Sequence, residues 1–595
     1  MLILGWLPGP DSKAGPDSEL VPCGEREPIK VVSSTEKHKA IQELADRYNK
    51  DETLRPRGTT CADVTVEGVS SGTAELLLAN PGVEDPAITG NDRAKVKGAQ
   101  VWTPSSTLWL DRLSLDTGHK VQLKSLGSLA RSPMVLAMHE KLAQRWNKNT
   151  PTWGEAIELL QDQGAKYTQE DPRGSTSGSM ATFLTFDAAA LANGKARLNP
   201  KTINEDDVRN ENIRKYVQDV QRAAESGYSS DSIEILKNWA RDDAVPEDTI
   251  FIIQEQMAWY YNSGQYAPDG EAPEVPLVAV YPVTKGDRST AESLFTDHPY
   301  VSLHESPKQQ DAAEDFFSFI TQENTLCKWG FRAPERMSTA NCSIPEGAGP
   351  NERIDLNKKI QALDLPTVDM QKAMHEAWRS LKSPRRILIA MDVSGSMKKD
   401  RLDTAIAAVR ESMEERLRAD DQVEVWQFAG TKDYQDPYWP VLDMRKVGKQ
   451  PKFPELKQEP HSRNTQQTAF LHTSKEAYKA MSGVRQEPDD KLAEEKTVDA
   501  VIIVSDGIDD WDDTNETVDT VCNEWSKPTL ARVPVVHTIY YEPYEDEDYS
   551  ESRIKAGKDA MERLATCNKK PTASSWNGND PESMKQAFSR IMTAL

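Results

Sequence analysis

The stretch from Arg386 to Met397 constrains the fold more than any other part of this chain. It begins with the apolar run Ile-Leu-Ile-Ala-Met, which predicts a buried β-strand, and it ends in an Asp-x-Ser-x-Ser loop. A helical pattern from about Asp400 to Arg418 follows, which completes a strand–loop–helix unit of an open α/β sheet. Ligands of such sheets bind beyond the carboxyl ends of the strands. One carboxylate and two hydroxyls at this position suit a small hard cation, and they belong to Asp392, Ser394 and Ser396.

Length and charge exclude several classes of protein. A chain of 595 residues is long enough for several domains, because one domain typically takes roughly 100–200 residues. The net charge is −23, from 72 basic and 95 acidic residues, which disfavours binding to nucleic acid or to an anionic membrane surface. The longest apolar runs are far shorter than the ~20 residues that cross a bilayer. We therefore expect no nucleic-acid partner and no membrane span in the chain as given.

The six cysteines fall into three local pairs. None lies in a Cys-x-x-Cys arrangement and the nine histidines do not cluster, which disfavours a structural zinc site. Two cysteines in each of three regions favour three local disulfides, and disulfides place a protein outside the cytoplasm. The alternative is six free thiols in a cytosolic protein. The expected pairs are Cys23–Cys61, Cys327–Cys342 and Cys522–Cys567.

Residues 1–24 are expected to precede the folded part. The apolar start Met1–Leu7 resembles the end of a signal or anchor segment whose charged leader is missing, and the polar stretch to about Pro22 is typical of a tether. A chance apolar start on a disordered end is the alternative. The expected protein is secreted, or anchored to a membrane through a missing N-terminal segment.

From about Pro28 to Glu335, short β-rich runs alternate with helical runs, as an α/β domain requires. An amphipathic helix is predicted at Glu36–Asn49, a helix at Thr249–Asn262 and a glycine- and serine-rich turn at Gly174–Gly178. A linker with a helix at Val368–Leu381 leads to a second α/β unit near Pro384. Further predicted elements are the strands or apolar runs Ile29–Ser33, Val64–Val69, Ala99–Trp102, Met134–Met138 and Leu277–Tyr281, and the helices Thr73–Ala79, Trp153–Gln161 and Gln309–Thr321.

Hydroxyl-rich loops lie at four predicted helix starts of the N-terminal part. Helix N-termini carry unpaired N–H groups, so such loops can close around an anion or a polar solute. Serine and threonine also cap helices in proteins of any function, which is the alternative for each loop taken singly. Four loops in one domain favour a shared cleft. They are Ser33–Thr35, Ser70–Thr73, Pro104–Thr107 and Ser175–Ser179.

The N-terminal part resembles bacterial extracellular solute-binding proteins, in the actinobacterial branch where such a domain precedes a von Willebrand factor A domain. The stretches that carry the resemblance are Val31–Lys37, Val101–Leu110, Arg131–Val135 and Asp297–Tyr300. It implies a two-lobed periplasmic-binding-protein fold over residues 25–335, with lobe one at about 25–130 and 275–335, lobe two at about 131–274, and the ligand between the lobes.

The same resemblance implies which side chains line the ligand cleft. Glu255 and Tyr260 line its facing side or are ordinary members of an amphipathic helix. No arginine lies in the hydroxyl loops to hold a carboxylate, so the class of solute stays open. The implied cleft donors are Ser34, Ser71, Ser105 and Ser177.

The stretch from Arg385 to Leu595 resembles a von Willebrand factor A domain, a doubly wound, Rossmann-like sheet with a metal-ion-dependent adhesion site. In this family the Asp-x-Ser-x-Ser loop is joined by a threonine of a middle loop and an aspartate after a later strand. Thr468 is chosen here over Thr465, although glutamines replace the glycines that usually precede it. The implied metal ligands are Asp392, Ser394, Ser396, Thr468 and Asp506.

An all-oxygen ligand set matches Mg²⁺, or Mn²⁺ or Ca²⁺ in its place. In the family, an open position on the cation is filled by an aspartate or glutamate of a protein partner. Two acidic runs, Asp509–Asp513 and Glu542–Asp548, raise the question of a second cation site. A solvated acidic loop is the favoured interpretation of both.

The leading hypothesis is a non-enzymatic, extracytoplasmic binding or adhesion protein at a bacterial surface, with residues 336–383 as a linker and 384–595 as the adhesion module. One alternative is a substrate-binding component that delivers a small polar solute to an ABC transporter. Another is an accessory subunit of an AAA-type ATPase. An enzyme is disfavoured, because the chain has no Gly-x-Ser-x-Gly elbow, P-loop, His-Glu-x-x-His helix or glycine-rich dinucleotide loop.

Overall fold

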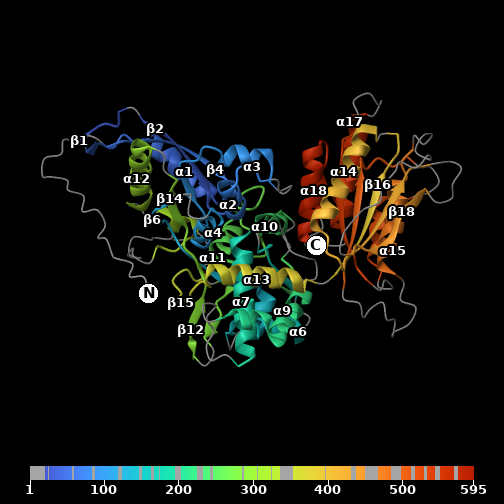
Figure 1. The fold of residues 1–595 in the computed structure, drawn as a ribbon, viewed down its shortest axis with the longest axis horizontal. Helices are drawn as coiled ribbons and strands as arrows, with labels where there is room; N and C mark the ends of the chain where they lie inside the picture. The colour runs from blue at the N-terminus through green and yellow to red at the C-terminus, as the bar shows by residue number, and fades with distance from the viewer. Residues whose placement is uncertain are drawn as a thin grey trace. The chain divides into compact units, whose positions relative to one another are not determined.

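Figure 1 shows the fold of the chain as a computed structural model. Residues 1–19 lie outside the part of the chain that the structure describes. Three residues named in the sequence analysis also lie outside it, namely Cys342, Ser396 and Thr465. The structure describes residues 20–595 except 25, 57–58, 84–87, 118–122, 147–149, 163–165, 173, 195–202, 224–231, 242–244, 285–286, 304–305, 323–324, 335–352, 383, 396, 398, 431–436, 449–466, 484–496, 511–515, 528–531, 543–549 and 568–573.

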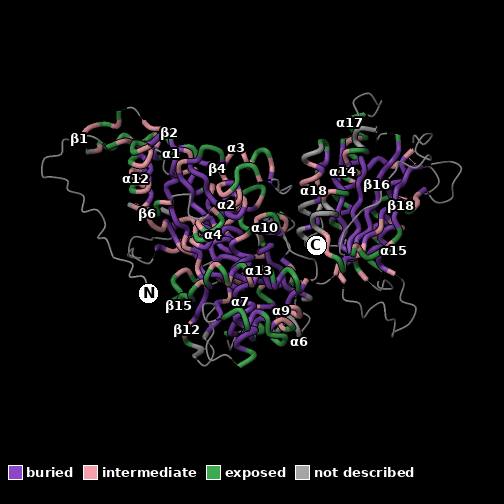
Figure 2. Tube along the Cα trace, in the orientation of Figure 1, coloured by how far each residue is buried: buried purple, intermediate pink, exposed green. Residues whose placement is uncertain are grey.

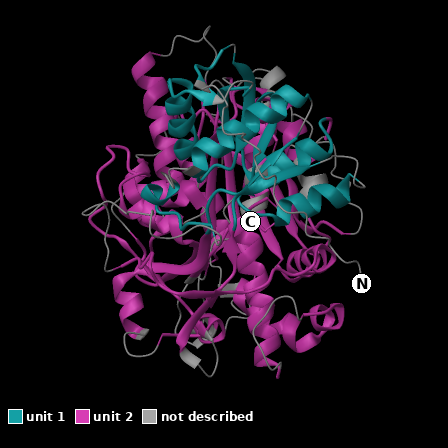
Figure 3. Ribbon diagram, turned by 90° about the vertical axis from the view of Figure 1, so that its left-hand side faces the viewer, with its two compact units in different colours: residues 1–81, 94–131, 297–345 teal, residues 82–93, 132–296, 346–595 magenta. Residues whose placement is uncertain are grey.

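The chain divides into two compact units (Figure 3). The first unit, in teal, comprises residues 1–81, 94–131 and 297–345, and the second, in magenta, comprises 82–93, 132–296 and 346–595. The predicted bounds of the lobes, the linker and the adhesion module stay predictions. Both units mix helices with sheets, so the α/β class expected from the sequence is confirmed at that level.

The first unit is built on one five-stranded sheet in the order β4-β2-β5-β14-β6. Strand β2 pairs in parallel with β4 and β5, while β14 runs antiparallel to β5 and β6. Helix α1 buries Ile41, Leu44, Ala45 and Tyr48 on one face, as the helical spacing of these residues predicts. The elements are β1 (Leu20–Val21), β2 (Glu27–Ser33), α1 (His38–Asn49), β3 (Arg55–Pro56), β4 (Ala62–Gly68), α2 (Ser71–Ala79), α3 (Gly90–Val96, which crosses the division), β5 (Val101–Thr103), α4 (Leu108–Asp116), β6 (Lys124–Ser128), β14 (Pro299–Ser302) and α12 (Pro307–Gln322).

The first half of the second unit has a sheet in the order β10-β7-β9-β8, with β13 also on β7, and a three-stranded sheet β11-β12-β15. Helix α7 is buried along almost its whole length. The strands are β7 (Ser132–His139), β8 (Lys166–Thr168), β9 (Thr249–Gln254), β10 (Leu277–Val280), β11 (Val283–Thr284), β12 (Asp287–Ser293), β13 (Phe295–Thr296) and β15 (Ile360–Ala362). The helices are α5 (Glu140–Ala143), α6 (Trp153–Asp162), α7 (Thr176–Ala192), α8 (Glu205–Arg209), α9 (Glu211–Ala223), α10 (Ser232–Arg241), α11 (Glu255–Asn262) and α13 (Val368–Leu381).

One local prediction in this region is wrong. The helix predicted over Thr249–Asn262 is strand β9 followed by helix α11. The run Ile250–Ile253 is buried between β7 and β8, because its β-branched and aromatic side chains fit a strand covered on both faces. The turn predicted at Gly174–Gly178 leads into α7, which begins at Thr176, and Ser175 is its N-cap and accepts from the Gly178 amide, as expected of a hydroxyl loop at a helix start.

Residues 384–595, here called the C-terminal module, contain a six-stranded sheet in the order β18-β17-β16-β19-β20-β21. All neighbouring strands are parallel except β18, which is antiparallel to β17. Alternate residues of β16 face opposite cores: Ile387, Ile389 and Met391 pack with α14 and α18, whereas Leu388 and Ala390 pack with α15, α16 and α17. The central strands are therefore buried on both faces (Figure 2).

The predicted strand and helix around the Asp-x-Ser-x-Ser loop are β16 and α14. The strands of the module are β16 (Arg385–Asp392), β17 (Gln422–Phe428), β18 (Tyr438–Lys446), β19 (Val498–Ser505), β20 (Val535–Tyr540) and β21 (Ser574–Asn577). Its helices are α14 (Lys399–Arg416), α15 (Phe470–Ser482), α16 (Val518–Trp525), α17 (Glu551–Thr566) and α18 (Pro581–Ala594).

Two of the three predicted disulfides are confirmed, Cys23–Cys61 and Cys522–Cys567. Cys327 is also disulfide-bonded, and its predicted partner lies outside the described residues. Among the helices that the structure describes, none combines the length and the apolar composition needed to cross a membrane.

Candidate metal centre

The end of β16 brings the predicted carboxylate and its neighbours to one edge of the sheet. Strands β16 and β19 are parallel and in register up to Met391 and Val504, so Asp392 and the residues after Val504 emerge side by side. The Asp392 carboxylate accepts hydrogen bonds from the Ser394 amide (2.9 Å) and from the Ser505 hydroxyl (2.7 Å). Parallel pairing, set by the apolar runs of both strands, therefore positions this carboxylate.

Two further predicted residues meet at the same edge. The Thr468 hydroxyl donates to the Ser394 hydroxyl oxygen at 2.8 Å, across 74 residues of sequence. Asp506 follows Ser505 directly, and its carboxylate accepts from the Ile508 amide at 3.0 Å. The structure thus brings together Asp392, Ser394, Thr468 and Asp506, whereas Ser396 lies outside the described residues.

Two neighbouring carboxylates set the electrostatics of this centre. Asp392 and Asp506 are both buried. Burial, and then the nearby charge of Asp506, raise the pKa of Asp392 to about 7, although the hydrogen bonds of Ser394 and Ser505 act in the opposite direction. A divalent cation that paired with both carboxylates would offset the cost of burying their negative charges close together.

The donor chemistry fits a hard cation. Every side chain that meets here offers oxygen, from two carboxylates and two hydroxyls, which matches Mg²⁺, Mn²⁺ or Ca²⁺. Across the described part of the chain, no group of three or more His, Cys, Asp or Glu side chains is placed to hold a metal ion. A cation here would therefore depend on the hydroxyls of Ser394 and Thr468 as well as on the carboxylates.

The contacts of Ser505, Asp509 and Asp510 were not predicted from the sequence. Ser505 bonds to Asp392, and its place at the end of an apolar strand, just before Asp506, was the available signal. The interpretation of Asp509 and Asp510 as a solvated loop is wrong, because both carboxylates accept backbone hydrogen bonds from the segment that carries Thr468. The rest of that run, from 511 to 513, lies outside the described residues, as do residues 543–548 of the second run.

In the first unit, three of the predicted cleft serines lie at the carboxyl ends of the parallel strands β2, β4 and β5. The Ser71 and Ser105 hydroxyls are 3.1 Å apart, and the Ser105 amide donates to the Ser71 hydroxyl oxygen at 3.0 Å. The Ser34 hydroxyl donates to the Glu36 carboxylate at 2.6 Å. These hydroxyls are partnered within the protein, but none of these bonds caps a helix: the N-cap of α2 is Ser70, which accepts from the Thr73 amide.

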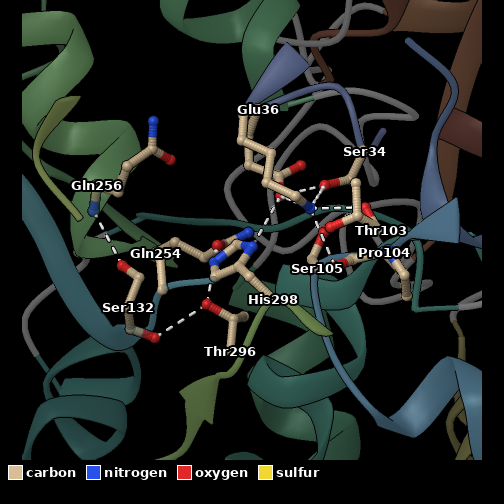
Figure 4. A network of polar contacts seen from close by, with 12 residues as sticks. Ser34, Glu36, Thr103, Pro104, Ser105, Ser132, Gln254, Gln256, Thr296 and His298 are labelled. Carbon is tan, nitrogen blue, oxygen red and sulfur yellow. Dashed lines mark hydrogen bonds and ion pairs between the residues drawn. The ribbon is translucent and has the colours of Figure 1, made fainter. Parts of the chain in front are cut away.

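A buried lysine, Lys37, completes this polar cluster, of which Figure 4 labels Ser34, Glu36, Thr103 and Pro104. The Lys37 ammonium is fully buried and donates to the Ser34 hydroxyl, to the Thr103 carbonyl (2.7 Å) and to the Pro104 carbonyl (3.0 Å). Its counter-charge is Glu36 at 3.9 Å, and Nδ1 of the buried His298 lies 3.5 Å from the same carboxylate. Sequence reasoning missed Lys37, because a lysine at the start of an amphipathic helix is normally solvated.

The fourth predicted serine, Ser177, belongs to the second unit. Its hydroxyl accepts from the Gln254 side-chain amide at 3.4 Å, and the Gln254 carbonyl oxygen accepts from the Thr296 hydroxyl at 3.0 Å. Glu255 and Tyr260 are both buried in α11, and Glu255 accepts from the Tyr281 hydroxyl at 2.6 Å. The second unit therefore carries an uncharged cluster of amides and hydroxyls around Gln254 (Figure 4).

Lys37 makes the stability of the first unit depend on pH. Burial lowers its pKa to about 8, against the opposing charges of Glu36 and Asp297, while a lysine in the unfolded chain keeps its ordinary pKa of 10.5. Below pH 8 both states are protonated and the burial penalty is complete; as the pH rises toward 10.5 the folded state loses its proton first and the penalty falls. Between pH 7 and pH 9.5, urea unfolding should therefore show the wild type gaining about 2 kcal/mol relative to Lys37→Met. An equal difference at both pH values would contradict this assignment.

The known proteins to which this chain is similar are all solved structures. No protein family and no curated protein matches the chain. The sulfate-binding protein SubI from Mycobacterium tuberculosis H37Rv is 15% identical, with a TM-score of 0.35, over 58% of this chain and 96% of that one. A periplasmic thiamin binding protein is 12% identical, with a TM-score of 0.38, over 61% and 100% of the two chains.

A third similar structure is the pilus adhesin SpaC from Lactobacillus rhamnosus GG. It is 13% identical, with a TM-score of 0.26, over 35% of this chain and 30% of its own. All three TM-scores lie below 0.5, so these likenesses establish neither the fold nor the function of the chain.

Proposed function

We propose that this chain is an extracytoplasmic, non-enzymatic binding protein whose C-terminal module is a von Willebrand factor A domain. Through Mg²⁺, or Mn²⁺ or Ca²⁺, it recognises an acidic residue of a protein partner. The observation that carries the proposal is the meeting of two buried carboxylates with two hydroxyls at one sheet edge, Asp392 and Asp506 with Ser394 and Thr468. A cation held by few charged ligands keeps part of its positive charge. A carboxylate of a partner is the natural group to fill the remaining position in its coordination.

The disulfides support the proposed location. Cys23–Cys61 and Cys522–Cys567 would not persist in a reducing cytoplasm. They favour a secreted or surface-anchored bacterial protein and disfavour the alternative role as an accessory subunit of a cytosolic ATPase.

Calorimetric titration with Mg²⁺ and Mn²⁺ tests the proposed function. The wild type should bind one equivalent, and Asp392→Ala should weaken binding by about 100-fold or more, since loss of outer-shell partners alone costs about 10–100-fold. Asp519→Ala is the matched control: it removes an aspartate from α16 whose ion pair with Arg563 is exposed. Absence of binding by the wild type, or equal binding by Asp392→Ala, would reject the cation site.

A second candidate function is binding of a small polar solute by residues 25–335, for delivery to an ABC transporter. Two polar clusters favour it, one around Ser34, Ser71 and Ser105 and the other around Gln254. Sulfate and thiamin, the solutes in the names of two similar structures, belong in the first set of compounds to titrate. Saturable binding that Asp392→Ala leaves unchanged would favour this candidate.

A further inference from the structure

The acidic pair Asp509–Asp510 is not among the proposed metal ligands, yet it contacts the segment that carries one of them. The Asp510 carboxylate accepts from the Thr468 amide at 2.5 Å, and the Asp510 amide donates to the Thr468 carbonyl at 3.2 Å. Two reciprocal bonds between the same residues fix both the position and the direction of the backbone at Thr468. Because the Thr468 side chain leaves from this backbone, Asp510 fixes where its hydroxyl lies.

Asp509 holds the helix that follows Thr468. Helix α15 begins at Phe470, and its N-cap residue, Ala469, makes no side-chain cap hydrogen bond. The Asp509 carboxylate accepts from the Leu471 amide at 3.3 Å instead, so it caps the helix from a distant part of the chain. Its negative charge also lies at the positive end of the helix dipole.

The hydrogen bonds from Asp509 and Asp510, here called the clamp, act on a loop that has no glycine directly before Thr468. Glutamine precedes Thr468 in this chain, and the Gln467 carbonyl accepts from the Gly430 amide at 2.6 Å. The loop is thus held at Gln467 by Gly430, at Thr468 by Asp510 and at Leu471 by Asp509. Three points within five residues are held in this way, and neither Gln467 nor Thr468 adopts a positive φ, so this part of the loop does not require glycine.

Helix α17 connects the clamp to the second carboxylate of the centre. Arg553 pairs with the Asp510 carboxylate at 3.5 Å. One helical turn further on, Gly557 lies so close to Asp506 and Gly507 that a Cβ on it would approach the Asp506 carbonyl oxygen within 3.0 Å. The same helix therefore contacts the segment that carries Asp506 directly, and it reaches Thr468 only through the Asp510 carboxylate that Arg553 pairs with.

We propose that Asp509 and Asp510 are positioning residues of the cation site, which hold Thr468 in place for the ion, and that Arg553 of α17 orients Asp510. The inference rests on the proposed function, since it concerns how the same site is assembled. Cation affinity would then depend on α17, a helix with no ligand of its own.

Titration of the full chain with Mn²⁺, followed by electron paramagnetic resonance, tests the positioning role. Asp510→Ala should weaken binding by about 10–100-fold, as loss of an outer-shell partner typically does. Asp510→Asn keeps an oxygen that accepts from the Thr468 amide, so it should restore most of the affinity. Arg553→Ala should weaken binding, while Arg563→Ala is the matched control, because Arg563 lies on the same helix in an exposed pair with Asp519.

The results for the variants test the positioning role, whereas the result for the wild type tests the cation site itself. An affinity of Asp510→Ala within twofold of the wild type would overturn the positioning role. Equal weakening by Asp510→Ala and Asp510→Asn would also overturn it, since the carboxylate would then act through its charge or as a ligand. A metal-free melting temperature measured for every variant excludes a general loss of structure, and failure of the wild type to bind Mn²⁺ would reject the cation site itself.

Discussion

Replacing Asp421 with alanine should lower the free energy of unfolding of the C-terminal module by about 3–5 kcal/mol, because it leaves the buried Arg385 guanidinium without its counter-charge and the partly buried Arg418 without the nearer of its two carboxylates. Asp421 is fully buried and lies immediately before β17. Its carboxylate accepts from Nε and the amide of Arg385 at 3.0 and 2.8 Å, and from the Arg418 amide at 2.8 Å. Burial raises the pKa of Asp421, but attraction by Arg385 and Arg418 and their hydrogen bonds outweigh it, so the pKa lies below its ordinary value.

The same network joins several elements, which is why its loss should be costly. Arg385 also donates to the Met592 carbonyl of α18 at 2.8 Å, and Arg418 donates to the Lys382 carbonyl at 2.7 Å. Urea unfolding measures the effect, with Asp420→Ala as the control. Asp420 is half exposed and lies 3.8 Å from Arg418, so its removal should cost about 0–1 kcal/mol. A cost below about 1 kcal/mol for Asp421→Ala would contradict the role of this network.

Replacing Gly507 with alanine should lower the stability of the module by about 2–5 kcal/mol, the sum of a left-handed backbone penalty of about 1–2 kcal/mol and an overpacking cost of about 1–3 kcal/mol. Gly507 has a φ of +70°, and a Cβ there would lie closer than 3.0 Å to the Gly557 carbonyl and to Met561. Because Gly507 follows Asp506, the shift needed to admit a side chain should also weaken cation binding.

Gly448 provides the matched control for this substitution. It has a φ of +77°, but a Cβ on it would meet nothing within 4 Å. Gly448→Ala should therefore show the backbone penalty alone and leave Mn²⁺ affinity unchanged. Equal losses for the two variants in thermal unfolding would show that the close approach of Gly507 to α17 has no energetic weight.

Local periodicity predicted much of the secondary structure. The bounds predicted for α13 are those observed, and the buried face of α1 is the predicted one. The failure at Thr249–Asn262 has a physical cause, since a short apolar run fits a buried strand and a buried helix equally well. Only its pairing with β7 and β8 decides for the strand, and those partners are far away in the sequence.

Local sequence pattern alone predicted only those site residues that lie together in one short segment. Asp392 and Ser394 stand in one motif, and family resemblance added Thr468 and Asp506. The pairing of Ser71 with Ser105 depends on two neighbouring strand ends, which no local pattern reveals. The same holds for the clamp made by Asp510, because it is a contact between loops 42 residues apart.

Anomalous diffraction from crystals grown with Mn²⁺ tests the central claim most directly. The proposed site predicts one strong manganese peak at the carboxyl end of β16, within a coordination distance of about 2.0–2.6 Å from the hydroxyl oxygens of Ser394 and Thr468. Asp392→Ala crystals should lack this peak. A wild-type map with no peak at this edge of the sheet, or with manganese bound elsewhere, would contradict the account.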